Sequence, residues 1–593
     1  MGKLGGFIRT PTKTGYDDIL KPLNSPQNNA IMDKEKLWKS PVEYTFDRHV
    51  GLNIKGIVLR ALDRLRLKSC IDFKPWDKME EYYINVINGT GCFSMIGREV
   101  KNGQILQLAE ACQRISIAEH EFLHALGFMH EHQRFDRDDF VTINFTNVIQ
   151  GLEVNFIKAE KDQYTTQSTQ YDYWSVMHYG PNAFSNGNGT TITTKNPRFM
   201  PIIGQTLGIS ATDVLELNLL YNCESSVAFV LHCDFSSDIA CPVTTCSNSS
   251  MRWEKVRHAI GGPTSDHTSL PTGYSQGLSY FMHVNTAKGE KGDSAWLETK
   301  RVTSKRKCAI KCLQFYYYHM NSESNDLNIW IREFENEQDF VGRHRLIGRI
   351  SGPQTKKWQI KYVPIETYKT FQVEFEVQRG EVPSTGGISI DDINLSEIQC
   401  PHVTLQIDSL PEIYNQTAQG YTIYSYNVYS TVGYRYSFGV SMEHPFIGMF
   451  IQLVSGKYDN ELTWPVPDSQ VTMQVLDQSP NIQSHMSYER STVSDLGQVN
   501  GNGTYRWGKP EDHGTYYIDD YNQTVYFGPK IGIKNFIPYE KMLLRHFLKG
   551  GSAVFNIFFE GSTDIIHNNY DHHNHHNYDH NYDHHSPPDL HHK

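Results

Sequence analysis

The sequence predicts a multidomain protein in which an α+β domain is followed by two all-β domains and a disordered tail. Residues before position 223 show both helical and strand-like apolar spacing, whereas later residues form short alternating strands separated by turn residues. The last residues are rich in histidine. A chain of 593 residues with 39% hydrophobic content is long enough for about three to four domains with cores of their own.

Two patterns predict regular structure at the start of the α+β domain. Residues 82–87 contain two tyrosines and Val86 and predict a strand. Residues 51–67 predict a helix because apolar side chains recur at helical spacing, at Ile57, Leu59, Leu62 and Leu65.

A second helix is predicted around His120, and its sequence carries chemistry. His120 and His124 lie four residues apart, so both imidazoles share one face of a helix, and Glu121 lies one step round. Gly127 then ends the helix, because a residue without a Cβ takes the positive φ that the turn requires. The reversed chain brings His130 back as a third imidazole.

Three neutral histidines predict one catalytic zinc ion, since they leave a coordination position open. Zinc lowers the pKa of water to roughly 7 and polarises a peptide carbonyl, and Glu121 is the candidate general base. The short pattern alone also fits a solvated helix that carries two histidines. The longer spacing through His130, followed by residues 175–179 as a Met-turn, favours a zinc peptidase.

Residues 130–138, with the sequence HEHQRFDRD, extend this motif as in the astacin family, and within that family the chain resembles the meprins. The resemblance implies that Tyr179 is a further zinc ligand that swings away to hydrogen-bond the oxyanion. It implies that Met177 forms an apolar floor beneath the zinc. It also implies that Glu131 receives the amino terminus of the mature enzyme.

The resemblance also divides the first part of the chain. Residues 1–28 correspond to part of a propeptide, in which Asp18 is the candidate aspartate that occupies the zinc position of the zymogen. Residues 29–223 correspond to the peptidase domain. Because Gln27 and Asn28 stand directly before Asn29, where a basic cleavage site would be expected, we predict cleavage before Asn28 or Asn29 by a protease that is not trypsin-like.

The subsites for substrate side chains depart from the family pattern. Family members that favour acidic residues after the scissile bond have arginines at the positions of Leu152 and Thr206. Without a guanidinium a pocket lacks the bidentate partner of a carboxylate. We therefore predict no strong acidic preference at P1′.

Two further domains are identified by resemblance, a MAM domain at residues 229–400 and a TRAF (MATH) domain at residues 401–561. The motifs that carry these resemblances are CDF at 233–235 and IDDI at 390–393 for the first, and LTWP at 462–465 and FLKG at 547–550 for the second. Such domains are β-sandwiches that serve adhesion, dimerisation or partner binding, so a homo-oligomer is expected. The cysteine that links meprin subunits corresponds to Ser275, which excludes a covalent dimer through that position.

The cysteines are expected to form disulfides. The resemblance implies four pairs: Cys70 with Cys223, Cys92 with Cys112, Cys233 with Cys241, and Cys312 with Cys400. Cys246 and Cys308 are left, and both pairing with each other and crosslinking of two chains stay open.

Composition indicates a secreted glycoprotein. A net charge of −11 gives no basic surface that would indicate nucleic-acid binding. The sequence also contains no uninterrupted apolar run of ~18 residues, so we expect no membrane-spanning helix in it. Ten cysteines fit an oxidising compartment, as do sequons at Asn88, Asn144, Asn415 and Asn522. Residues 1–6 lack the apolar region of a signal peptide, so we expect the amino terminus to be incomplete.

The tail, residues 562–593, is predicted to be disordered. Ten histidines among Asn-Tyr-Asp repeats cannot bury enough apolar surface to fold. Clustered imidazoles are able to bind zinc, copper or nickel, and the alternative is a polar tail without a ligand.

Two functions follow from these features. The first is a secreted zinc metalloendopeptidase that cleaves extracellular proteins and peptides. The alternative is a non-catalytic adhesion or scaffold protein that acts through the MAM and TRAF-like domains. The intact Glu121 favours the first, because a silent protease has no use for a general base.

Overall fold

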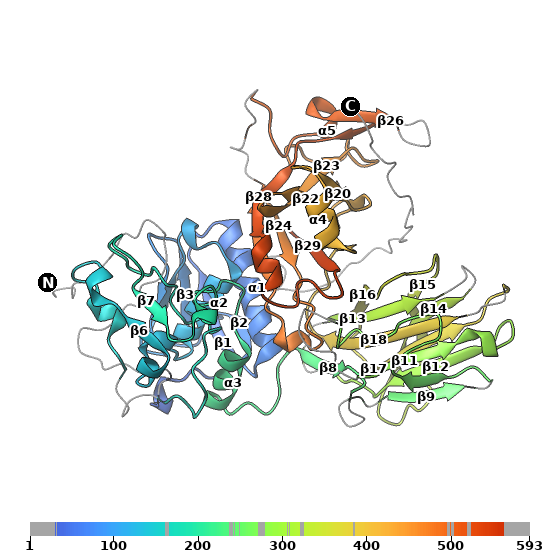
Figure 1. The fold of residues 1–593 in the computed structure, drawn as a ribbon, viewed down its shortest axis with the longest axis horizontal. Coiled ribbons are helices and arrows are strands. Elements are labelled where there is room, and N and C mark those ends of the chain that lie inside the picture. The colour runs from blue at the N-terminus through green and yellow to red at the C-terminus, as the bar shows by residue number, and fades with distance from the viewer. Residues whose placement is uncertain are drawn as a thin grey trace.

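The computed structural model describes most of the chain in three parts. The described residues are 30, 32–159, 165–236, 241, 243–247, 250–270, 279–304, 306, 309–320, 325–382, 386–494, 499, 503–518 and 524–561. Figure 1 shows the first part, coloured blue to green, at one side, a green-to-yellow sandwich at the other, and an orange sandwich above their junction. Asp18, Ser275, Cys308 and the histidines of the tail lie outside the described residues.

The first part is the predicted α+β domain, and its sheet has the strand order β2-β1-β3-β5-β4. All neighbours in this sheet are parallel except β4 and β5. The strands are β1 (Val42–Phe46), β2 (Phe73–Pro75), β3 (Ile84–Ile87), β4 (Phe93–Ser94) and β5 (Gln104–Gln107), and a separate antiparallel pair is β6 (Val141–Ile143) with β7 (Ile192–Thr194). The helices are α1 (Leu52–Lys68), α2 (Ile115–Ala125) and α3 (Ala211–Leu220).

The predicted strand at 82–87 starts two residues later than expected. Tyr83 stacks on Trp76 with ring centroids 3.8 Å apart, and the Arg98 guanidinium lies 4.2 Å from the ring centre of Tyr82. These aromatic contacts hold both tyrosines in the loop before β3, so only residues 84–87 join the ladder.

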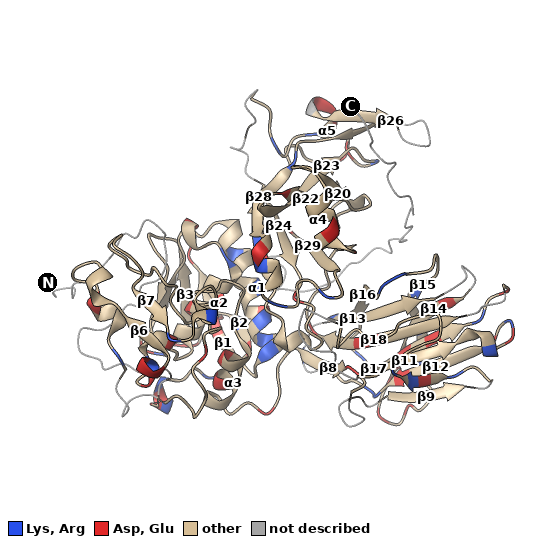
Figure 2. Ribbon diagram, in the orientation of Figure 1, with Lys and Arg blue, Asp and Glu red and all other residues tan. Residues whose placement is uncertain are grey.

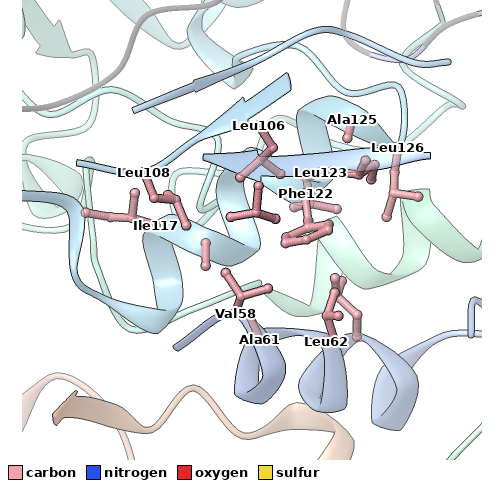
Figure 3. Close-up of a cluster of buried hydrophobic side chains, with 14 of the residues drawn as sticks. Val58, Ala61, Leu62, Leu106, Leu108, Ile117, Phe122, Leu123, Ala125 and Leu126 are labelled. Carbon is pink, nitrogen blue, oxygen red and sulfur yellow. The ribbon is translucent and has the colours of Figure 1, made fainter. Parts of the chain in front are cut away.

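Helix α1 packs its apolar face on α2, the helix that carries His120. Figure 3 shows Val58, Ala61 and Leu62 of α1 pointing toward Phe122 of α2 and Leu106 of β5, and all five are fully buried. This packing explains the helical spacing of apolar residues in 51–67. The opposite face of α1 contacts strands of the orange part, so α1 is covered on two sides.

The second part is the first predicted sandwich. One sheet has the order β10-β11-β18-β13-β16, with β8 beside β18, and the other has the order β15-β14-β17-β12-β9. The strands are β8 (Phe229–Cys233), β9 (Val243–Ser247), β10 (Trp253–Val256), β11 (Phe281–Asn285), β12 (Ser294–Thr299), β13 (Ile310–His319), β14 (Asp326–Phe334), β15 (Arg343–Ile350), β16 (Gln359–Glu366), β17 (Thr370–Gln378) and β18 (Gly387–Ser396). Leu313 and Ile390 of one sheet meet Leu297 and Val373 of the other in a common core.

We expect the stability of this sandwich to depend on pH through His283, a residue of β11 that is 7% exposed. Burial lowers the pKa of His283 to about 4 from 6.5, and its cross-strand neighbour Glu254 offsets this only in part. Between these pH values His283 binds a proton more readily in the unfolded chain than in the folded one. Its contribution to the free energy of unfolding should therefore fall by about 3 kcal/mol as the pH drops from 6.5 to 4. We expect His283→Gln to reduce the slope of Tm against pH in this window, while the buried His178 and His485, whose pKa values burial also lowers to about 4, keep part of it. An unchanged slope would contradict the assignment.

The third part is the second predicted sandwich. Its sheets have the orders β19-β29-β24-β25 and β20-β22-β23-β27-β26, with β21 beside β22 and β28 beside β23. The strands are β19 (Val403–Ile407), β20 (Thr422–Tyr424), β21 (Val428–Tyr429), β22 (Arg435–Glu443), β23 (Phe446–Val454), β24 (Ser469–Val475), β25 (Tyr488–Val493), β26 (Thr515–Ile518), β27 (Thr524–Phe527), β28 (Ile531–Pro538) and β29 (Ala553–Gly561), with the helices α4 (Leu410–Gln416) and α5 (Pro510–His513). Leu207 and Trp174 of the first part pack into its core, so the two parts share one apolar cluster.

The described cysteines form the four disulfides that the family resemblance implies: Cys70–Cys223, Cys92–Cys112, Cys233–Cys241 and Cys312–Cys400. Cys246 is exposed and unpaired among the described residues. Pairing of Cys246 with Cys308 stays open, because Cys308 lies outside them. Among the described helices, none has the length and apolar character needed to cross a membrane.

Candidate metal centre

Three buried histidines converge in the first part of the chain. One ring nitrogen from each of His120, His124 and His130 lies within 4.8 Å of the other two. His120 Nδ1 donates to Val176 O at 2.8 Å, and His124 Nδ1 donates to Phe128 O at 2.7 Å. Because a carbonyl oxygen only accepts, these bonds fix the tautomer and leave Nε2 of both rings as the nitrogen that can bind a cation.

The turn after α2 delivers the third histidine. The Leu126 amide donates to Phe122 O at 2.8 Å, and the Phe128 amide donates to Leu123 O at 3.0 Å, which closes the end of the helix. Gly127 has φ of +112°, the left-handed conformation expected at this position. The chain thus reverses, and the His130 ring lies 5.3 Å from that of His120 and 4.7 Å from that of His124.

Glu121 lies on α2 directly after His120 and is fully buried. Its place on the helix is that of the predicted general base, one step round from the histidine face. A carboxylate held out of bulk water beside a cation site is a group that can take and return a proton.

The predicted Met-turn is tied to α3 by a residue that the sequence interpretation missed. Asp213 accepts from Ser175 Oγ at 2.6 Å and from the Val176 amide at 2.9 Å, and it also completes the capping box of α3 with Ser210. Burial raises the pKa of Asp213 to about 6. Met177 is buried in the same core as α2. The Ser-x-x-Asp capping pattern at 210–213 was the signal available in the sequence.

Tyr179 stands beside the histidines, as the resemblance implies. Its ring centroid lies 4.2 Å from that of His130 and 4.1 Å from that of His132. Gly204, with φ of +74°, lets the next segment approach closely, because a Cβ there would lie 2.7 Å from the Gly180 amide nitrogen. This contact fixes the backbone that carries the tyrosine.

Glu131 follows the turn after α2, and Ala30, the first described residue, contacts Phe128 in that turn. Glu131 is buried, accepts from the Asp172 amide at 2.7 Å and lies 3.4 Å from Arg134 Nη1. Burial and the nearby Glu216 raise its pKa well above the usual value. Ala30 is also buried and bridges Phe128, three residues before Glu131.

The two candidate subsite residues have different surroundings. Leu152 is buried in the apolar cluster that includes Tyr179. Thr206 is half-buried, and its Oγ1 accepts from Arg114 Nη1 at 3.1 Å. A guanidinium thus lies beside Thr206, although neither position 152 nor position 206 carries an arginine, and the prediction of no strong acidic preference at P1′ stays a prediction. Arg114 is the residue at the amino-terminal cap of α2, 92 positions away in sequence.

Comparison with known proteins agrees with this geometry. The model of the astacin peptidase family matches residues 30–222, and those of the MAM and MATH domains match residues 233–401 and 402–558. Human meprin A subunit beta is 38% identical over 542 residues, which cover 91% of this chain and 76% of that protein. The chain belongs to the astacin family. Mouse meprin A subunit alpha is 35% identical to this astacin, with 92% of this chain and 73% of that protein covered.

Two further similar proteins cover a smaller share of this chain. The zinc metalloproteinase nas-13 of Caenorhabditis elegans is 32% identical over 46% of this chain and 56% of that protein. Among solved structures, a hatching enzyme zinc-protease from Oryzias latipes is 34% identical, with 33% of this chain and all of that chain covered at a TM-score of 0.30.

As an astacin, the chain is a metalloprotease of a family that implies zinc. The residues present fit that ion. Three buried imidazoles converge, two of them with hydrogen bonds that direct Nε2 inward, and nitrogen ligands of this number are those of a catalytic zinc site.

Proposed function

We propose that the chain is a secreted zinc metalloendopeptidase that hydrolyses peptide bonds in extracellular proteins and peptides. The observation that carries this proposal is the convergence of His120, His124 and His130 beside the buried Glu121 on one helix. The four disulfides and the sequons support an oxidising, extracellular setting.

Each residue has a role in this proposal. The three histidines hold one zinc ion, which when bound lowers the pKa of water and polarises the scissile carbonyl. Glu121 accepts the proton of the attacking water and gives it to the leaving amine. The Tyr179 hydroxyl is assigned as the donor to the oxyanion, an assignment supported by the position of its ring, whose centroid lies 4.2 Å from that of His130. Met177 closes the floor of the site from the core.

The test is digestion of a proteome-derived peptide library with protein that begins at Asn29. We expect cleavage that a chelator abolishes and that stoichiometric zinc restores. If correctly trimmed, zinc-loaded protein leaves the library intact, the function moves to binding through the MAM and MATH domains. The cut sites also give the preference at P1′. A preference for Asp or Glu would assign recognition of the carboxylate to Arg114. The absence of an acidic preference would agree with the neutral side chains of Leu152 and Thr206.

Tyr179→Phe is expected to lower kcat by about 10²- to 10³-fold with KM nearly unchanged, since a donor to the oxyanion acts in the transition state. Steady-state kinetics on one library-derived peptide measures the split. The matched control is Tyr173→Phe, because the Tyr173 hydroxyl donates to Phe140 O at 2.9 Å and takes no part in this role. Equal losses in both variants would contradict the assignment.

A further inference from the structure

Helix α1 presents a charged stripe to the MATH domain. Gly56, Arg60, Arg64 and Lys68 recur every four residues and therefore share one face. The Gln470 side chain of β24 lies against Gly56, so that a Cβ there would displace it, and Lys68 Nζ donates to His485 O at 2.7 Å. Figure 2 shows blue positions along α1 where it meets the part that Figure 1 colours orange.

A MATH carboxylate is buried against this stripe. Glu489 of β25 is 2% exposed at its side chain and lies 2.7 Å from Arg60 Nε and 3.1 Å from Arg64 Nη2. Burial alone would raise the pKa of Glu489, but the two guanidinium groups lower it to about 2. The carboxylate is therefore charged near neutral pH, and the two arginines of α1 balance its charge.

Arg64 also pairs with a carboxylate of α2, the helix that carries His120 and His124. Its Nη1 lies 3.3 Å from Glu119 Oε2, and the same guanidinium donates to Ser487 O at 3.0 Å. Glu119 is fully buried on α2 and directly precedes His120. A run of three charges, Glu489 to Arg64 to Glu119, thus joins the MATH domain to the helix that holds two of the histidines.

The backbone leaves space for this run at one glycine. Gly208 has φ of +132°, and a Cβ there would lie 2.7 Å from Glu119 Oε2 and 2.9 Å from Arg64 Nη1. The neighbouring carbonyl, Leu207 O, accepts from Arg64 Nη1 at 3.4 Å. The loop after the Met-turn is therefore shaped around the Arg64–Glu119 pair.

We propose that Glu489 is a positioning residue for the peptidase, acting through Arg64 and Glu119 on the part of α2 that carries His120. A buried charge that loses its partner must move toward water or draw water in. Without Glu489, Arg64 loses one of its two carboxylates and no longer holds Glu119 in place, and the histidine that follows shifts with it. The MATH domain then helps to hold the zinc-binding histidines in position. This inference rests on the proposed zinc peptidase.

The experiment compares full-length Glu489→Gln with Glu511→Gln, a MATH carboxylate whose side chain is 48% exposed and pairs with Lys509. We expect Glu489→Gln to release zinc to a chromogenic chelator about 10- to 100-fold faster, and to lower kcat by a similar factor with KM for a short peptide unchanged. Glu511→Gln should match the wild type in both. Glu119→Gln should lose as much as Glu489→Gln, and the double variant little more, because both act through Arg64.

Arg64→Lys is the second variant if Glu489→Gln does not fold. Lysine keeps the positive charge but lacks the planar guanidinium whose N–H groups bond two carboxylates at once. We therefore expect Arg64→Lys to release zinc faster than the wild type, as Glu489→Gln should. Lowered Tm with wild-type zinc release and kcat would overturn the proposal and leave the charge run a purely structural tie. If the wild-type protein itself binds no zinc, the proposed function fails instead, so the two failures are distinct.

Discussion

Glu121→Gln is expected to lower kcat/KM by about 10²- to 10⁴-fold while the protein keeps its fold and its metal. Glutamine has nearly the shape of glutamate but cannot accept the proton of the attacking water. The three histidines are unchanged, so one zinc per chain should remain bound. Steady-state hydrolysis of a peptide, with metal content measured by mass spectrometry, gives both quantities.

The control for this variant is Glu110→Gln, which removes an exposed carboxylate just before α2. It should leave activity and zinc unchanged. If Glu121→Gln kept wild-type activity, the general base would be another group. If it lost zinc together with activity, the result would indicate damage to the metal site and not the loss of a base.

Removing the Cys70–Cys223 disulfide is expected to destabilise the peptidase domain by about 5 kcal/mol. The two cysteines are 153 positions apart, so the bond closes a very long loop and removes much of the entropy of the unfolded chain. We expect the Cys70→Ala/Cys223→Ala variant to unfold at a much lower concentration of guanidinium chloride. Zinc release follows the unfolding of this domain specifically, which avoids mixing in the other domains.

The matched variant removes Cys92–Cys112 from the same domain. Here the separation is only 20 positions, so the expected loss is about 3 kcal/mol. The order of the two losses is the test. Equal losses, or a larger loss for the shorter loop, would show that loop entropy does not govern the contribution of these bonds.

The local features of this protein could be predicted from its sequence because they depend on neighbours in the chain. The helix around His120, its end at Gly127 and the return of His130 follow from spacing and from the conformation that only glycine adopts readily. The two sandwiches followed from strand spacing and family motifs, and the structure confirms them.

The features that could not be predicted join residues far apart in sequence. Arg114 reaches Thr206 across 92 positions, and Arg60 reaches Glu489 across 429. A charged residue every fourth position on a helix usually indicates a face in water. On α1 that interpretation fails, because the apolar face is used by α2 and the charged face meets carboxylates and carbonyls of another domain.

The two covered faces of α1 also limit how such a protein can be rearranged by gene fusion or recombination. A cut after Cys223 separates two domains in sequence, but it leaves Arg60, Arg64 and Lys68 without the groups they bond across the junction. A replacement for the MATH domain would have to offer a buried carboxylate to both arginines and a carbonyl to the lysine. The peptidase and its distant carboxy-terminal neighbour are therefore expected to be inherited as a pair.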